Sequence, residues 1–221
     1  MESIKLFLSG TDRLRDMLCS TADGGSKLSR GVREIVAERY PGRAEVEVVF
    51  ESSRGASSLR QAVEAGPSQL SSSRSDIVVT SVDAEFTATE AASADEYEAD
   101  MLAAIRSIKS DPGSHIIVLL ASTIDPETIV SNYQREESDP NSLRVHRYDL
   151  AAMRLSFEEG ISVLDVDRII AEMGAADHVP AFLDYSEAAC DAISQEMVRI
   201  MDDYAFFDER PLLPQVGRDT K

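Results

Sequence analysis

Residues 150–174 have the sequence LAAMRLSFEEGISVLDVDRIIAEMG, in which the spacing of apolar residues changes at one glycine, Gly160. Before this glycine, apolar positions recur every three or four residues, as they do on one face of a helix. The predicted helical stripe consists of Leu143, His146, Leu150, Met153 and Phe157. After it comes the short apolar run Ile161–Val166, which is typical of a buried strand. Because glycine readily adopts the conformation that ends a helix, the stretch predicts a helix, a turn and a strand.

The same alternation of short apolar runs and longer amphipathic runs extends over the whole chain. The predicted strands are Ile4–Leu8, Val46–Glu51, Ile77–Val82, Ile116–Ala121 and Ile161–Val166. Strands that alternate with helices indicate a parallel sheet covered on both faces. Together with the rule that crossovers are right-handed, this predicts a three-layer α/β/α sandwich with the flavodoxin-like strand order 2-1-3-4-5.

Two of the helices carry clear start signals. Ser93 and Glu96 have the spacing of a capping box, which predicts a helix over Ala94–Lys109. Ser186 is expected to cap the last helix, because its side-chain oxygen can accept a hydrogen bond from a free N–H of the first turn.

Composition limits the class of protein. The 221 residues fit one compact domain, and 43% hydrophobic with 28% charged residues exclude collagenous and disordered chains. Two cysteines are too few for a disulfide framework, and no run approaches the roughly 18 apolar residues of a membrane span, so we expect a cytoplasmic protein without membrane contact. The formal net charge of −18 repels phosphate backbones, so nucleic acid is not an expected partner.

We predict one α/β domain over residues 1–205 and a docked tail over residues 206–221. The tail contains Phe206, Phe207, Leu212 and Leu213, which together are too apolar to remain in water without a surface to contact. The surface belongs either to the same chain or to a partner subunit, and a homodimer is the commonest arrangement of the second kind.

Polar residues follow every predicted strand at the point where it ends. The polar segments are Ser9–Asp12, Ser52–Gly55, Asp83–Glu85, Ser122–Asp125, Asp165–Asp167 and, before the last helix, Asp184–Ser186. Open parallel sheets bind their ligands beyond the carboxyl ends of the strands. The sequence therefore predicts a site for a small-molecule ligand or substrate at this edge.

The order of these segments resembles the SGNH, or GDSL-like, hydrolase family. In that family the first strand enters a Gly-Asp-Ser turn, and an Asp-x-x-His pair precedes the last helix. The segments most similar to it are residues 150–174 and VPAFLDYSEAACDAISQEMVRI, residues 179–200. The resemblance covers nearly the whole chain and implies an ester or acyl hydrolase that needs no cofactor.

The residues at the family's site positions differ from its catalytic set. Gly10-Thr11-Asp12 stands where the family has Gly-Asp-Ser, so Asp12 occupies the serine position. The family has four short sequence blocks that contribute site residues. Gly55 matches the glycine of the second block, whose N–H helps to form an oxyanion hole, and Glu85 falls near the asparagine of the third block.

At the last block, Ala181 and Asp184 occupy the positions of the family's aspartate and histidine. The resemblance therefore implies that Asp12 and Asp184 occupy catalytic positions, in place of the family's serine and histidine. It implies a set of residues that contact the substrate: Gly10, Thr11, Gly55, Glu85 and Tyr185.

A serine nucleophile needs a nearby base, normally histidine. His115 opens a strand at the far edge, and His146 lies on an apolar helical stripe, where a core histidine is the expected reading. His178 is the one histidine near the last block. An alternative is therefore that Ser9 acts as the nucleophile and His178 as the base, both shifted from the family's positions. In the competing interpretation Ser9 is simply the polar end of a strand.

The carboxylates offer a different chemistry. If the family geometry holds, Asp12, Glu85 and Asp184 face one another, and oxygen ligands of this kind suit Mg²⁺, Ca²⁺ or Mn²⁺. Without a cation, crowded carboxylates raise one another's pKa and can form an acid and base pair. Alternatively, Asp12 and Asp184 cap the helices that follow, as Asp165 is expected to do, with Asp167 on the surface.

The leading functional hypothesis is an SGNH-like protein that acts on or binds an ester- or acyl-bearing small polar metabolite with a reworked site. The alternatives are a catalytically silent binding or assembly protein on the same scaffold and a carboxylate-based divalent-metal enzyme. A dinucleotide or P-loop site is excluded, because no Gly-x-Gly-x-x-Gly follows the first strand and no Gly-Lys-Ser occurs.

Overall fold

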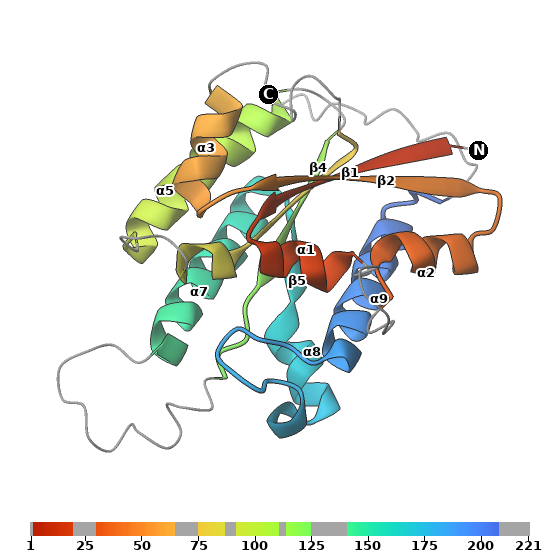
Figure 1. Ribbon diagram of the computed structural model, residues 1–221. Helices are drawn as coiled ribbons and strands as arrows, with labels where there is room; N and C mark the ends of the chain where they lie inside the picture. Colours follow the sequence, from red (N-terminus) through yellow and green to blue (C-terminus); the bar gives the residue numbers. More distant parts are fainter. Residues whose placement is uncertain are drawn as a thin grey trace.

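The sheet contains five parallel strands in the order β2-β1-β3-β4-β5, as the sequence predicts (Figure 1). The computed structural model describes residues 2–19, 30–64, 75–86, 92–110, 114–124 and 141–207. The strands are Glu2–Gly10 (β1), Ala44–Ser52 (β2), Ile77–Ser81 (β3), His115–Leu120 (β4) and Ser162–Asp165 (β5). All strands therefore end at one edge, and the polar segments of the sequence leave the sheet there.

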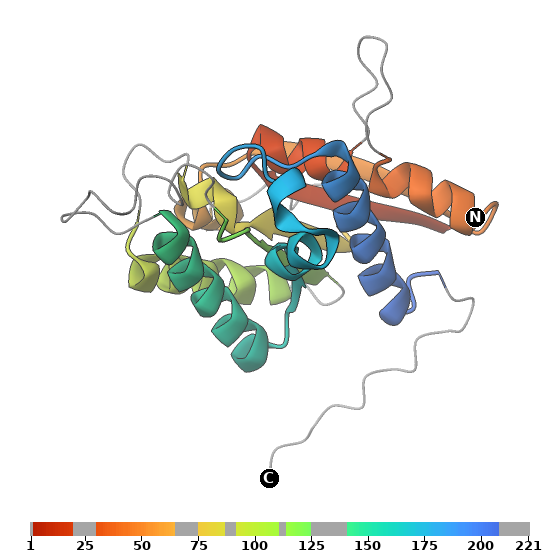
Figure 2. The ribbon, with the colours of Figure 1, turned by 90° about the horizontal axis from the view of Figure 1, so that it is seen from below.

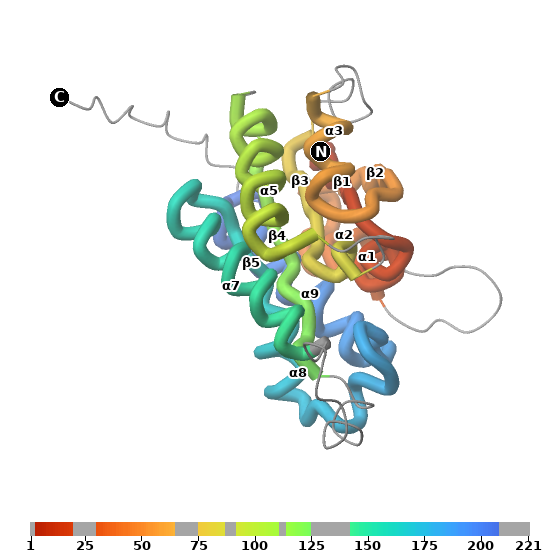
Figure 3. Tube along the Cα trace, turned by 90° about the vertical axis from the view of Figure 1, so that its left-hand side faces the viewer, coloured from red at the N-terminus to blue at the C-terminus, as the bar shows by residue number. Residues whose placement is uncertain are grey.

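Helices cover both faces of the sheet (Figures 1 and 3). Those on one face are Asp12–Leu18 (α1), Val32–Arg39 (α2), Val166–Met173 (α8) and Glu187–Asp203 (α9). Those on the other are Ala56–Glu64 (α3), Ala94–Lys109 (α5) and Asn141–Glu159 (α7), and two 3-10 helices, Val82–Phe86 (η1) and Ala175–Asp177 (η2), lie in connections. This is the predicted three-layer sandwich.

Alternation along the central strand β1 produces two separate apolar cores. Leu6 and Leu8 pack with α1, α2 and α9, whereas Phe7 packs with α3, α5 and α7. Successive side chains of a strand point to opposite faces, so a strand buried on both sides is apolar at nearly every position. Figure 2 shows the same division, with α9 beside α2 and α5 beside α7.

The predicted apolar stripe on α7 is wrong. Leu143, Leu150, Met153 and Phe157 are exposed, Phe157 to 92%, and His146 is exposed as well, so it is not a core histidine. The buried face is instead formed by Val145, Tyr148, Ala151, Ala152 and Leu155. Two apolar stripes compete on this helix, and the stripe with alanines lets the backbone approach α5 more closely. Gly160 ends the helix with φ 64°, as expected.

The described part of the C-terminal segment contacts the domain. Phe207 is buried, and its ring stacks on that of Tyr40 at 4.2 Å between centroids. The ring of Phe206 lies 5.5 Å from His115. Leu212 and Leu213 lie outside the described residues, and the docking of the tail as a whole stays a prediction.

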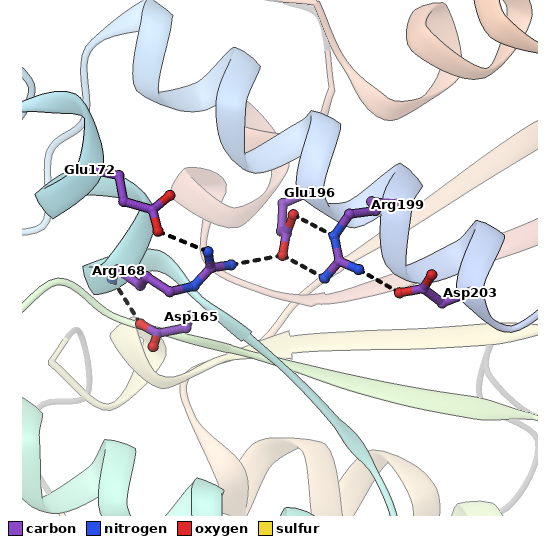
Figure 4. A network of polar contacts seen from close by, with 6 residues as sticks. All are labelled: Asp165, Arg168, Glu172, Glu196, Arg199 and Asp203. Atoms are coloured by element: carbon purple, nitrogen blue, oxygen red, sulfur yellow. Dashed lines mark hydrogen bonds and ion pairs between the residues drawn. The ribbon is translucent and has the colours of Figure 1, made fainter.

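A network of ion pairs joins α8 to α9 (Figure 4). Glu196 accepts hydrogen bonds from Arg168 at 2.9 Å and from Arg199 at 2.8 Å, and Arg199 also pairs with Asp203. The network fixes two helices that flank the loop before α9, from which the last-block residues project. Among the described helices, none is long and apolar enough to cross a membrane.

Candidate functional site

A buried carboxyl group joins the ends of the first and third strands. Asp83 is 2% exposed and accepts hydrogen bonds from the hydroxyls of Thr11, at 3.0 Å, and Ser81. Burial raises the pKa of Asp83, whereas the two hydroxyls lower it. Position 10, just before Thr11, requires a small residue, because a Cβ on Gly10 would lie 2.7 Å from the side chain of Leu14.

The second and third strand exits meet at Gly55 and Glu85. Gly55 has φ 98°, and the next N–H, of Ala56, donates a hydrogen bond of 2.5 Å to the Glu85 carboxylate. A Cβ on Gly55 would lie 2.5 Å from the same oxygen, so only glycine fits. Burial raises the pKa of Glu85, and the Ala56 hydrogen bond opposes this shift. The N–H that follows the one assigned to an oxyanion hole by the resemblance is therefore occupied by a carboxylate of the chain itself.

Tyr185 closes the edge of the sheet between the ends of β3 and β4. Its hydroxyl accepts a hydrogen bond of 3.0 Å from the Ser122 N–H, and burial raises its pKa. The gap that Tyr185 shares with Asp83 and Ser81 is too narrow to admit water. The expected crevice is therefore filled by a phenol ring at this point.

A tight turn before Tyr185 decides which last-block residue faces the site. Ala181 and Asp184 form an isolated antiparallel bridge, and Leu183 adopts φ 57°. This turn buries Leu183 and leaves Asp184 exposed. A left-handed conformation is costly for leucine, roughly 1–2 kcal/mol, and burial of its side chain offsets that cost.

Two further carboxyl groups lie at the exit of β4, and sequence reasoning missed both. Asp167 accepts hydrogen bonds from the Ser122 hydroxyl at 3.2 Å and from the Thr123 N–H at 3.0 Å, so it is not a plain surface residue. Asp149, buried on α7, accepts one from the Ala121 N–H at 3.1 Å. Burial raises the pKa of Asp149 to about 8, and the charges of Asp167 and Asp165 act in the same direction.

Asp149 escaped prediction because the α7 stripe was assigned to the wrong face. An aspartate next to Tyr148, within the true buried face, is the signal that could have revealed it. Asp165, by contrast, caps α8 by accepting a hydrogen bond from the Arg168 N–H, as expected.

The carboxylates proposed to share a metal do not come together. Asp12 is at the surface, where its carboxylate pairs with Arg15 at 3.0 Å, and Asp184 is exposed. The described residues contain no group of three or more His, Cys, Asp or Glu side chains that could hold a metal ion. The prediction that Asp12, Glu85 and Asp184 face one another is therefore wrong. Neither aspartate is the cap of its helix, since Thr11 and Ser186 hold those positions.

His178 is paired with a serine other than Ser9. Its Nδ1 lies 2.8 Å from Oγ of Ser186, which also caps α9 by accepting a hydrogen bond from the Ala189 N–H. Ser9 is 2% exposed within β1, between Glu51 and Thr80 of the neighbouring strands. Among the described residues, no hydrogen bond joins Ser9 and His178.

Several solved structures share this arrangement of strands and helices. A member of the lipolytic G-D-S-L family from Veillonella parvula superposes with a TM-score of 0.62 at 13% identity, covering 90% of this chain and 98% of the other. The acetyl xylan esterase AlAXEase gives 0.63 at 12% identity, with 89% and 99% covered. LAE5, an alpha/beta hydrolase enzyme from the metagenome of Lake Arreo in Spain, gives 0.62 at 16%, with 91% and 97% covered. The chain has the SGNH hydrolase fold. No protein-family model and no curated protein sequence matches it.

Within the SGNH fold, the first three blocks converge as the resemblance implies, and the fourth does not. Thr11 contacts Asp83, the Ser53 N–H donates to the Gly10 carbonyl at 2.8 Å, and Ala56 contacts Glu85. At the fourth block, Tyr185 rather than Asp184 lies at the strand ends. The SGNH edge of this protein therefore combines buried carboxyl groups, hydroxyls and one phenol.

Proposed function

We propose that this SGNH-fold protein binds a small polar metabolite bearing an ester or acyl group, and that it does not hydrolyse this group by the serine mechanism. The observation that carries the proposal is the 2.5 Å hydrogen bond from the Ala56 N–H to Glu85, beside Gly55. An N–H in this position suits an oxygen that carries full or partial negative charge, such as a carboxylate or the carbonyl oxygen of an acyl group. The Glu85 carboxylate holds the place that the ligand oxygen takes after displacing it.

The residue at the family's serine position cannot perform the first step of ester hydrolysis. That step requires a hydroxyl nucleophile and a base that removes its proton. Asp12 has no hydroxyl, and its side chain is 74% exposed and paired with Arg15. The imidazole of His178 is bonded to Ser186, whose oxygen also caps α9. Binding without serine catalysis follows from this arrangement.

The test of chemistry uses a serine-directed fluorophosphonate and p-nitrophenyl acetate. We expect no stoichiometric labelling and no esterase activity above background. Stoichiometric labelling, or activity abolished by both Ser186→Ala and His178→Ala, would overturn the non-hydrolytic proposal, because a serine and histidine pair would then be at work.

The test of binding uses calorimetric titration with an acetylated xylo-oligosaccharide, chosen because one structure of the same fold is an acetyl xylan esterase. Glu85→Ala frees the Ala56 N–H, so we expect about tenfold tighter binding than in the unaltered protein. Glu85→Gln preserves the shape of the side chain, and because its neutral amide oxygen is a weaker acceptor than a carboxylate, we expect a smaller gain in affinity that serves as the test if the alanine variant folds poorly. Glu64→Gln, an exposed glutamate of α3 paired with Arg60, is the matched control. Failure of all Glu85 variants to bind would refute the proposal.

A second candidate function, assembly as a homodimer, is favoured by the exposed stripe of α7. Its residues are placed symmetrically about Leu150, since Leu143 and Phe157 each lie seven positions away. Two copies of α7 packed antiparallel across a twofold axis would bring Leu143 against the partner's Phe157, which is the reciprocal contact of an isologous interface. We expect a dimer in sedimentation velocity and a monomer for Phe157→Asp. A monomeric unaltered protein at about 100 μM would contradict this.

A further inference from the structure

A second cavity, of about 380 Å³, lies between the start of α5 and the first turns of α7. Its walls are formed by Ala92, Ser93, Ala94, Asp95, Arg144, Arg147 and Tyr148. None of these residues belongs to the hydrogen bonds of Gly55, Glu85 and Asp83, and the sequence predicts of Ser93 and Ala94 only that they start a helix. The volume falls within the range of about 300–1,000 Å³ that is usual for small-molecule sites.

One wall of the cavity carries two guanidinium groups, on Arg144 and Arg147 of α7. Arg144 lies over the ring of Phe86, with its central carbon 5.1 Å from the ring centroid, and it hydrogen-bonds to the Tyr148 hydroxyl. No described carboxylate forms an ion pair with Arg144, whereas Arg154 on the same helix pairs with Glu98 at 3.1 Å. An aromatic ring and a phenol therefore orient the Arg144 guanidinium without neutralising it.

The position of these arginines is unusual for so acidic a chain. Acidic residues outnumber lysine and arginine by 40 to 22 in the chain, yet the walls of this cavity contain two arginines and one carboxylate, that of Asp95. A guanidinium presents N–H donors in a planar fork that matches the two oxygens of a carboxylate or the oxygens of a phosphate. The α7 wall therefore suits an anionic group.

The opposite wall suits hydroxyl groups. It contains the Ser93 hydroxyl and the Asp95 carboxylate, in the first turn of the 16-residue helix α5. Asp95 accepts hydrogen bonds from hydroxyls and repels a second anionic group. Ser93 and Glu96 already cap the helix, so the helix end alone does not create the site. The two walls therefore suit different ends of one ligand, an anionic group on the α7 side and hydroxyl groups on the α5 side.

We propose that this cavity binds a small polyhydroxylated organic anion of sugar size, with its carboxylate or phosphate group on Arg144 and Arg147 and its hydroxyls toward Asp95. The proposal uses residues other than those of the proposed function, and it stands if acyl binding at Glu85 fails.

The experiment is calorimetric titration at low ionic strength with glucuronate, glucose 6-phosphate, glucose and inorganic phosphate. We expect saturable, salt-sensitive binding of glucuronate or glucose 6-phosphate and none of glucose, and the preferred anion identifies a carboxylate or a phosphate monoester. Arg144→Gln and Arg147→Gln each weaken this binding at least tenfold. Arg154→Gln, on the same helix and paired with Glu98, leaves it unchanged.

Three outcomes overturn the proposal. They are the absence of saturable binding by both sugar anions, equal binding of glucose, and unchanged affinity in both Arg144→Gln and Arg147→Gln. Inorganic phosphate that binds as tightly as either sugar anion would refute the role of the Asp95 wall. Melting curves of each variant separate a lost site from a lost fold.

Discussion

Asp149 makes the stability of the fold depend on pH near neutrality. Its side chain is buried against the end of β4, and its pKa is raised from 3.8 to about 8. The native state therefore keeps a proton that the unfolded state releases above pH 4 or so. The stabilisation is complete at low pH and is lost as pH rises through 8. Asp149→Asn removes the titration while its amide oxygen can still accept the Ala121 hydrogen bond.

The size of the effect follows from the two pKa values. With a folded value of about 8, protonation of Asp149 stabilises the fold by about 2.7 kcal/mol at pH 6 and about 0.4 kcal/mol at pH 8. The unaltered protein should therefore lose about 2 kcal/mol more than Asp149→Asn over this interval. Asp83 and Glu85, whose pKa values are also raised by burial, contribute equally to both proteins and cancel in the comparison.

The assay is urea denaturation of both proteins at pH 5, 6, 7 and 8. Asp191→Asn is the control, because its ion pair with Arg30 lowers the pKa of Asp191, so that its stabilising effect is lost only in acid. Parallel pH profiles for the unaltered protein and Asp149→Asn would refute the reasoning, since a carboxyl group that is ionised in both states cannot produce a slope.

Two further substitutions test the backbone and the C-terminal contact by urea denaturation. Gly55→Ala combines a left-handed φ of 98° with a clash against Glu85 and should cost about 2 kcal/mol or more, whereas Gly42→Ala, at φ 75° with no atom within 4 Å, should cost about 1 kcal/mol. Equal losses would exclude the clash. Phe207→Ala should cost about 3 kcal/mol because the ring is buried, and Phe206→Ala, which is half-buried, less than half as much. A negligible effect of Phe207→Ala would show that its stacking does not stabilise the fold.

The fold followed from the sequence because strands buried on both faces are nearly continuous in apolar residues. Each predicted strand agrees with the observed one to within two residues at either end, from Ile4–Leu8 against Glu2–Gly10 to Ile161–Val166 against Ser162–Asp165. Periodicity failed on α7, where two stripes have similar spacing. The choice between them depends on how closely the helix can approach its neighbours, and that distance is set by tertiary packing rather than by period.

The site was predicted only in part, for a different physical reason. Thr11, directly after β1, and Glu85, in the 3-10 helix that follows β3, are held close to the sheet edge, and they contact Asp83 and Ala56 there. Asp184 lies in a loop, where one residue with positive φ, Leu183, turns the following side chains in another direction. Sequence spacing does not specify that turn.

In the proposed function, the buried carboxyl groups let an SGNH-fold edge without a serine nucleophile bind an acyl ligand. Burial raises the pKa of Asp83 and of Glu85, although the charge of Arg13 opposes this shift at Asp83. A raised pKa shifts each group toward its protonated form, and a protonated carboxyl can donate a hydrogen bond, which a carboxylate cannot. An acyl oxygen that displaces the Glu85 side chain would gain the Ala56 N–H and could accept a second hydrogen bond from the carboxyl it displaced. With Asp12 at the serine position and Glu85 at the Ala56 N–H, the proposed edge holds a neutral acyl group without cleaving it.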